Sequence, residues 1–120
     1  MTEDFKSKII EYYTFLDNNE KEKSLALFSS DAVYKRCEDI YLGKPDIVEF
    51  FTKKYKLKGK HEILKMNQDK ETIIVRGIFD GINGRDEQVR DFFCDIFTFN
   101  EDGLVFTRET YLARGAKDIN

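Results

Sequence analysis

The sequence contains few of the residues that mark disulfide-rich, metal-binding or membrane proteins. Its 120 residues include two cysteines, one histidine, one proline and no tryptophan. Cys37 and Cys94 provide neither a disulfide framework nor the spacing of a metal site, so we expect reduced thiols and a cytoplasmic location. The longest apolar runs are too short to span a membrane, and the N-terminal residues do not have the pattern of a signal peptide.

The charge balance is slightly acidic and gives no basic excess. Twenty Lys and Arg against 23 Asp and Glu leave a net charge of -3, with a pI near 5.3. This balance argues against nucleic acid as a partner. The length predicts one domain over residues 1–120 that is large enough for its own core. Eleven phenylalanines and six tyrosines predict an interior lined by aromatic rings.

Apolar spacing and turn residues predict helices followed by strands. The expected helices cover residues 2–16, with Thr2 as the N-cap, then 20–28 and 46–55. The apolar residues of the first helix fall at helical spacing: Phe5, Ile9, Tyr12, Tyr13 and Leu16. The expected strands cover residues 32–36, 61–67, 72–79, 89–99 and 104–112, and a polar tail follows from about residue 113. This order indicates an α+β domain whose helices lie on one face of a curved, mainly antiparallel sheet.

The longest predicted hairpin spans residues 89–112 and turns at Asn-Glu-Asp-Gly, residues 100–103. These are strong turn residues, and the flanking segments are rich in residues that favour strands. Counting outward from the turn places Asp95 directly opposite Glu109. Because side chains alternate along a strand, one face would carry the following residues: Phe93, Asp95, Phe97, Phe99, Val105, Thr107, Glu109 and Tyr111. The other face, also largely apolar, would carry Phe92, Cys94, Ile96, Thr98, Phe106, Arg108, Thr110 and Leu112.

The predicted contact between Asp95 and Glu109 has a chemical consequence. Two adjacent carboxylates cannot both ionise cheaply, so one of them should have a raised pKa. A carboxyl group of that kind suits a general acid or base. The alternatives are a register shifted by one residue, or an Asp95 that pairs with an arginine or lysine and only braces the sheet.

The order of elements and several segments resemble the SnoaL-like branch of the nuclear-transport-factor-2-like (NTF2-like) superfamily, a cone-shaped α+β fold also called cystatin-like. The similar segments are LFSSDAVYKR at 27–36, YLGKPDIVEFF at 41–51, His61 at the start of a strand, IIVRGIFDG at 73–81 and FFCDIFTFNEDG at 92–103. The superfamily includes ketosteroid isomerases, polyketide cyclases, epoxide hydrolases, dehydratases and proteins without known activity.

The resemblance implies a pocket between the helices and the concave face of the sheet. The implied ligand is a small, mostly apolar or aromatic molecule with a carbonyl or hydroxyl group. The implied chemistry is proton transfer without a cofactor, in an isomerase, cyclase or dehydratase. A non-catalytic carrier, sensor or dimerisation module remains the alternative. The resemblance also implies a homodimer formed through the apolar second face of the sheet.

Compared with ketosteroid isomerases, two catalytic positions have the matching residue and one does not. Tyr12 lies where those enzymes have the tyrosine of the oxyanion hole, and Asp95 lies where they have a protonated aspartic acid. Their catalytic base corresponds to Arg36, and an arginine cannot act as that base. We therefore do not expect steroid isomerisation by the same mechanism. The predicted catalytic set is Asp95, Glu109 and Tyr12.

The predicted ligand-binding set consists of residues expected to face the pocket: Tyr34, Arg36, His61, Phe79, Phe93, Phe97 and Tyr111. His61 is either an acid/base group or a structural residue near a strand end. Arg36 either orients an anionic or carbonyl group or forms an ion pair with Asp95 or Glu38. Without a second histidine or a nearby cysteine, no metal site is predicted.

Two further features allow two interpretations each. Gly77 either leaves room for a ligand against the sheet or marks a bulge that bends it. Residues 53–60 contain five lysines. This run is either a solvated helix end and turn or a weak anion-binding patch.

Overall fold

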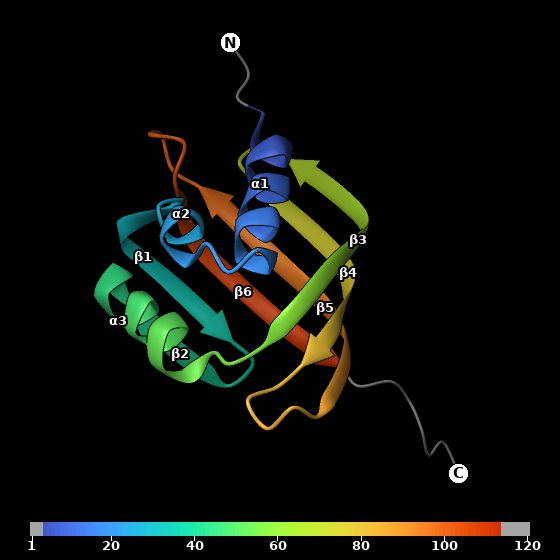
Figure 1. Cartoon of the computed structure of the whole chain (residues 1–120). Helices are drawn as coiled ribbons and strands as arrows, with labels where there is room; N and C mark the ends of the chain where they lie inside the picture. Colours follow the sequence, from blue (N-terminus) through green and yellow to red (C-terminus); the bar gives the residue numbers. More distant parts are fainter. Residues whose placement is uncertain (1–3, 114–120) are drawn as a thin grey trace.

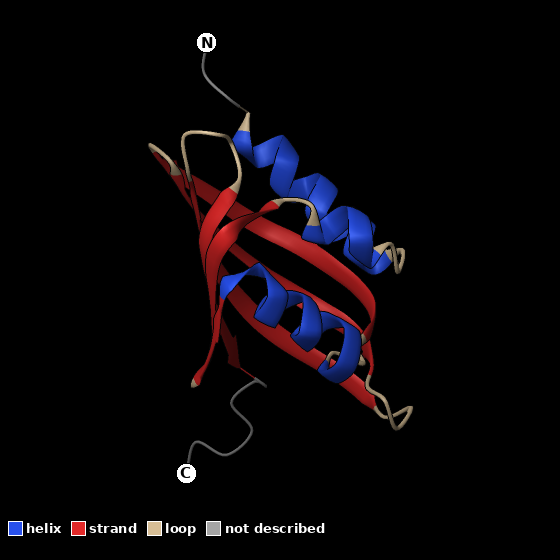
Figure 2. Ribbon diagram, turned by 90° about the vertical axis from the view of Figure 1, so that its left-hand side faces the viewer, coloured by secondary structure: helices blue, strands red, loops and turns tan. Residues whose placement is uncertain are grey.

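The computed structural model describes residues 4–113 as a curved sheet with helices on one face (Figures 1 and 2). The helices are α1 (Phe5–Asp17), α2 (Lys21–Leu25) and α3 (Gly43–Glu49), and α3 continues as the π-helical turn η1 (Phe50–Lys54). The strands are β1 (Phe28–Arg36), β2 (Asp39–Leu42), β3 (Lys58–Asp69), β4 (Thr72–Ile82), β5 (Gln88–Phe99) and β6 (Val105–Ala113). The predicted cap at Thr2 and the predicted tail beyond Ala113 lie outside the described residues.

The six strands form one sheet in the order β2-β1-β6-β5-β4-β3. The pairing is antiparallel everywhere except between β1 and β6, which run parallel. The predicted α+β class with a mainly antiparallel sheet is confirmed. None of the helices in residues 4–113 is long and apolar enough to cross a membrane.

Helix α1 lies across the concave face of the sheet and supplies residues to the core. Its first turn is capped by Asp4, whose carboxylate accepts a hydrogen bond of 3.1 Å from the backbone nitrogen of Ser7. Four residues at helical spacing are buried against the sheet: Ile9, Tyr12, Tyr13 and Leu16. The helix ends at Asp17, one residue beyond its predicted end at residue 16.

The segment after α1 differs from the prediction in two ways. Helix α2 ends at Leu25 rather than at residue 28, and Phe28 is instead the first, fully buried residue of β1. Strand β2 was not predicted. It pairs back onto β1 through a two-residue turn in which Cys37 has a φ of 53°. This edge strand has only four residues, and three of them are exposed, so it has no alternating pattern that the sequence could show.

The long hairpin has the predicted turn but not the predicted register. The nitrogen of Asn100 donates to the carbonyl of Leu104 at 2.8 Å. Immediately beyond the turn, however, Phe99 pairs with Val105 and Thr98 pairs with Thr107. Phe106 is therefore an extra residue in β6, a bulge that reverses the facing of the rest of that strand. The predicted contact between Asp95 and Glu109 is wrong.

Gly77 lies where a bulge in β3 meets β4, between the pairs Ile63–Gly77 and Lys65–Arg76. A Cβ atom at this position would overlap the carbonyl oxygen of Glu62 and the ring of Phe93. The space beside Gly77 is therefore taken by Phe93. Of the two interpretations made for this glycine, the structure supports the bulge.

Candidate functional site

A small cavity lies between the helices and the concave face of the sheet. Its volume is about 20 Å³, which is room for roughly one water molecule. Five residues of the predicted sites line it: Arg36, His61, Phe79, Phe93 and Asp95. The remaining lining residues are Leu16, Phe51, Tyr55, Leu57, Asp91, Arg108, Thr110 and Leu112.

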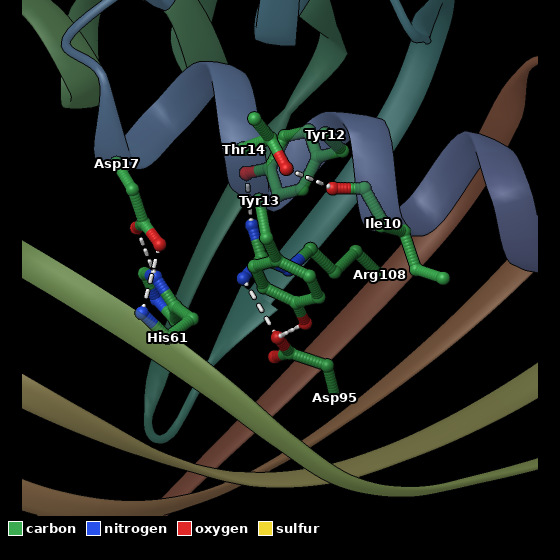
Figure 3. Close-up of polar contacts among 8 residues, drawn as sticks. All are labelled: Ile10, Tyr12, Tyr13, Thr14, Asp17, His61, Asp95 and Arg108. Carbon is green, nitrogen blue, oxygen red and sulfur yellow. Dashed lines mark hydrogen bonds and ion pairs between the residues drawn. The ribbon is translucent and has the colours of Figure 1, made fainter.

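Asp95 lies at the centre of a buried hydrogen-bond network (Figure 3). Its Oδ2 atom accepts hydrogen bonds from Arg108 Nη2, at 2.9 Å, and from the hydroxyl of Tyr13. Its Oδ1 atom accepts a hydrogen bond from the hydroxyl of Thr110. All four side chains are at most 3% exposed. Asp95 therefore pairs with an arginine, as the structural alternative predicted, but that arginine is Arg108.

The guanidinium of Arg108 lies in an aromatic cage. Its carbon atom is 4.8 Å from the ring centroid of Tyr34, 5.1 Å from that of Tyr12 and 5.2 Å from that of Phe97. Its Nη1 also donates to the hydroxyl of Tyr12. Burial lowers the pKa of Arg108, but Asp95 and the surrounding tyrosine hydroxyls outweigh it, and the pKa is raised well above its ordinary value. Arg108 is therefore a permanent cation beside the cavity.

One donor of Arg108 remains without a protein partner. Within residues 4–113, its buried Nε–H has no hydrogen-bond acceptor. A buried donor left unpaired costs roughly 1–3 kcal/mol, so such groups commonly bind water or a ligand oxygen. Because Arg108 also lines the cavity, an oxygen bound there would offset this cost.

Tyr12 and Tyr13 are neutral phenols in this network, where Tyr13 donates to Asp95 and Tyr12 accepts from Arg108. Burial raises the pKa of both phenols above their ordinary value near 10, and Asp95 adds to the shift for Tyr13. Burial likewise raises the pKa of Tyr55, at the mouth of the cavity.

These shifts predict a loss of stability in alkali. A phenol whose pKa is raised by folding contributes its full stability below pH 10, and the contribution is lost as the pH rises above that value. The free energy of unfolding should fall by about 1.4 kcal/mol per pH unit for each such tyrosine. Urea denaturation at several alkaline pH values would measure the slope. Tyr13→Phe should make the slope shallower, and an unchanged slope in that variant would contradict the assignment.

The second polar feature of the cavity joins the end of α1 to β3. Asp17 Oδ1 lies 2.5 Å from Nδ1 of His61, and Asp17 Oδ2 accepts a hydrogen bond of 2.8 Å from the backbone nitrogen of His61 (Figure 3). The imidazole is 4.8 Å from the ring of Phe79, 4.9 Å from Tyr13 and 5.3 Å from Phe93. With Nδ1 assigned as the donor to Asp17, Nε2 carries the lone pair.

The remaining predicted residues lie outside the cavity lining. Tyr12, Tyr34 and Phe97 are buried in the adjoining core. Glu109 and Tyr111 lie on the outer face of the sheet, where the hydroxyl of Tyr111 donates to Glu109 at 2.9 Å. The bulge at Phe106 explains this, because it turns both side chains away from the helices.

Arg36 lines the cavity but does not form either predicted ion pair. Its Nη1 donates to the hydroxyl of Tyr34 at 2.9 Å. Its guanidinium carbon lies 5.4 Å from the ring centroid of Phe50 and 5.8 Å from that of Tyr55. Within the described residues its guanidinium is not paired with a carboxylate of Asp95 or Glu38.

Several residues of the site were not predicted from the sequence: Tyr13, Asp17, Asp91, Arg108 and Thr110. The periodicity of α1 places Tyr13 on the buried face, one turn before Asp17, which could have indicated both. Arg108 and Thr110 were assigned to the outer face because a bulge of one residue leaves no clear signal in the sequence. Asp91 alternates with Phe93 and Asp95 along β5, so the same strand pattern could have placed it inward.

Comparison with known proteins agrees with this architecture. The SnoaL-like domain family matches residues 9–107. No protein of curated function shows significant sequence similarity to the chain.

Solved structures with low sequence identity share the fold. An NTF2-like protein of unknown function from Burkholderia pseudomallei superposes with a TM-score of 0.81 at 13% identity, covering 94% of this chain and 93% of the other. A protein from Shewanella denitrificans, provisionally named a SnoaL-like polyketide cyclase, gives 0.78 at 11% identity, covering 91% and 90%. An LEH-like epoxide hydrolase from Mycobacterium tuberculosis gives 0.74 at 14% identity, covering 89% and 80%.

The family match covers most of the described chain, and the similar structures share its curved sheet and covering helices. The predicted resemblance to the NTF2-like superfamily is confirmed. The chain belongs to the SnoaL-like domain family.

Proposed function

We propose that this protein binds a small, largely apolar carbonyl or hydroxyl compound at the cavity and moves a proton on it. The reaction class would be that of an isomerase, cyclase or dehydratase. One observation supports this most directly: His61, oriented by Asp17, and the cationic Arg108 line the same aromatic cavity. A group that takes a proton and a group that stabilises a negative oxygen are the two requirements of such chemistry.

In this proposal His61 is the acid/base residue. Asp17 holds Nδ1–H in place, so Nε2 is the atom that accepts a proton from the carbon next to the carbonyl group. The proton can then return from Nε2 to another carbon or oxygen of the same molecule. Asp17 is a positioning residue because it acts through the imidazole.

Arg108 stabilises the oxygen that becomes negative when the proton leaves. Its Nε–H has no acceptor within residues 4–113, so it can donate to the ligand without losing a protein contact. Asp95 positions Arg108, because all three of its hydrogen bonds are accepted from protein donors. Asp95 is thus not arranged to donate to a ligand oxygen, unlike the corresponding residue of ketosteroid isomerases. The chemistry proposed needs no cofactor.

The cavity must widen for a ring compound to enter. Tyr55 and Leu57 line both the cavity and the larger groove outside it, so rotation of these two side chains would join the two spaces. The names of two structural neighbours, a polyketide cyclase and an epoxide hydrolase, support acid/base chemistry on this fold. The fold by itself does not assign a reaction.

A two-step experiment tests the proposal. A thermal-shift screen of ring ketones and ring alcohols would identify binding, since a ligand at about 100 times its Kd adds roughly 2.7 kcal/mol of stability. Proton NMR in heavy water would then follow the exchange of the α-protons of β-tetralone, an apolar aromatic ketone. The proposal requires exchange above the buffer rate. A flat screen together with exchange at the buffer rate would reject it.

The alternative is a carrier or sensor that binds the same class of molecule without reaction. The full set of protein donors around Asp95 favours it, because a carboxylate held in this way suits a rigid wall. Binding of the ketone in the thermal-shift assay without any exchange would support the carrier.

We further propose that two copies of the chain associate through the outer face of the sheet. Large apolar side chains are exposed there on neighbouring strands: Ile74, Phe92, Phe106 and Tyr111. In Figure 2 the helices lie on the opposite face. Leu112, predicted for this surface, instead lines the cavity. Pairing two copies would bury these side chains, and each Å² of apolar area removed from water stabilises the dimer by about 25 cal/mol.

If the chain forms this dimer, one charge introduced into the apolar patch should dissociate it. Wild type should have twice the protomer mass of 14.2 kDa in light scattering. Phe106→Lys, which places a cation in the apolar patch, should shift the mass to that of the monomer. Ile10→Lys is the matched control, because it places the same cation at an exposed apolar residue of α1, on the helical face opposite the patch, and this variant should remain dimeric. A monomeric wild type at micromolar concentration would contradict the proposal.

A further inference from the structure

Beside the cavity, the chain forms a basic groove between two segments that are distant in sequence. One wall is the segment from η1 to β3, and the other is the loop between β4 and β5. The groove has a volume of about 440 Å³. Four cationic side chains line it, and no aspartate or glutamate does: Arg36, Lys54, Lys56 and Arg85. The apolar part of its wall is Phe50, Tyr55 and Leu57.

This concentration of positive charge is unusual for a chain with a net charge of -3. The lysine run at residues 53–60 supplies only part of this charge. Lys54 and Lys56 line the groove, whereas Lys53 and Lys60 do not. Like charges that converge repel one another unless a counter-ion joins them. An adjoining groove of about 370 Å³ shares Lys56 and adds Lys21 and Lys58, together with one acidic residue, Asp86. Burial, followed by Lys56 and Lys58, lowers the pKa of Lys21, as expected in a region of positive potential.

Arg36 connects the basic groove to the cavity. It lines both spaces, as do Tyr55 and Leu57. Its guanidinium is half-buried and held by the hydroxyl of Tyr34 and by the rings of Phe50 and Tyr55. Within residues 4–113 no carboxylate forms an ion pair with it. Arg85, in contrast, pairs with Glu87 at 2.9 Å on the exposed loop, so part of its charge is already compensated.

We propose that the basic groove binds the anionic group of the ligand, a carboxylate or a phosphate, while the apolar body of the ligand reaches the cavity. The inference rests on the proposed function and narrows its substrate class to amphipathic organic anions. Arg36 binds the anionic group where the groove joins the cavity, and Lys54 and Lys56 add positive charge from the groove wall. Phe50, Tyr55 and Leu57 contact the apolar body. Charge-assisted hydrogen bonds make such recognition stronger than contacts with a neutral hydroxyl.

The test compares three probes in calorimetry at low salt. Cinnamate carries a carboxylate, phenyl phosphate carries a phosphate, and cinnamyl alcohol is the neutral match to cinnamate. At least one anion should bind about tenfold more tightly than the alcohol, as expected for one charge-assisted hydrogen bond. The double change Arg36→Gln with Lys56→Gln should abolish this preference. Lys53→Gln, in the same lysine run but outside the groove, should keep it.

Three outcomes would overturn the inference: no preference for either anion, a preference that survives the double change, or an equal loss in Lys53→Gln. If the double variant does not fold, Lys56→Gln alone changes an exposed side chain and still must weaken the anion selectively. Amide NMR separates this inference from the proposed function. Shifts in residues 54–57 and 83–85 together with shifts at His61 and Asp95 would support the whole inference. Shifts confined to residues 54–57 and 83–85 would support the anion site, but they would overturn entry of the apolar body into the cavity and, with it, the proposed function.

Discussion

Arg108→Met is expected to lower the free energy of unfolding by about 3–5 kcal/mol, the cost of breaking a buried ion pair. The change leaves the carboxylate of Asp95, only 1% exposed, without its cationic partner. The hydroxyl of Tyr12 also loses its donor. Methionine keeps much of the apolar volume of the stem, so the loss of charge dominates the effect. The melting temperature should fall by roughly 10–20 °C for a domain of this size.

A double-mutant cycle measures the coupling within this pair. Asp95→Leu alone should be destabilising by a similar amount, because it leaves Arg108 charged and unpaired in the core. Combining Asp95→Leu with Arg108→Met removes both charges and should cost much less than the sum of the single changes. Urea denaturation of the four proteins gives the coupling energy. Additive losses would mean that the two side chains do not interact as the structure shows.

His61→Gln is expected to reduce the α-proton exchange of β-tetralone by about a hundredfold or more, the usual contribution of a general acid/base group. In this variant the backbone nitrogen at position 61 can still donate to Oδ2 of Asp17. The glutamine amide keeps the cavity wall polar, but it cannot carry the proton. Asp17→Asn should give a smaller loss, because the imidazole remains and only its orientation is weakened. Rates of exchange by proton NMR, with Kd values from calorimetry, separate loss of chemistry from loss of binding.

Glu109→Gln is the matched control for this experiment. The structure places Glu109 on the outer face, opposite Ile96 and bonded to Tyr111, so exchange should proceed at the wild-type rate. A large loss in this variant would indicate that the register of β6 differs from the one described. An unchanged rate in His61→Gln would reject His61 as the acid/base residue and return Asp95 to consideration.

Local signals in the sequence predicted most of the elements and one wall of the site, although they missed β2 and extended α2 into β1. The helical spacing of Ile9, Tyr12 and Leu16 predicted the buried face of α1. The turn residues from Asn100 to Gly103 predicted the hairpin, and strand alternation placed Asp95 inward on β5. These properties depend on residues close together in the chain, whose propensities and periodicity can be recognised without tertiary contacts.

The partners of those residues were decided only by the tertiary structure. The bulge at Phe106 depends on how β6 pairs with β5. Because of it, Thr110 rather than Glu109 lies opposite Asp95, and Arg108 faces inward and bonds to Asp95. The pairing of His61 with Asp17 joins the end of a helix to a strand 44 residues later. The basic groove likewise needs β1, η1 and a distant loop in one place. A sequence pattern predicts the face of a residue only while the strand remains regular. Bulges, strand register and packing between distant segments decide which side chains finally meet.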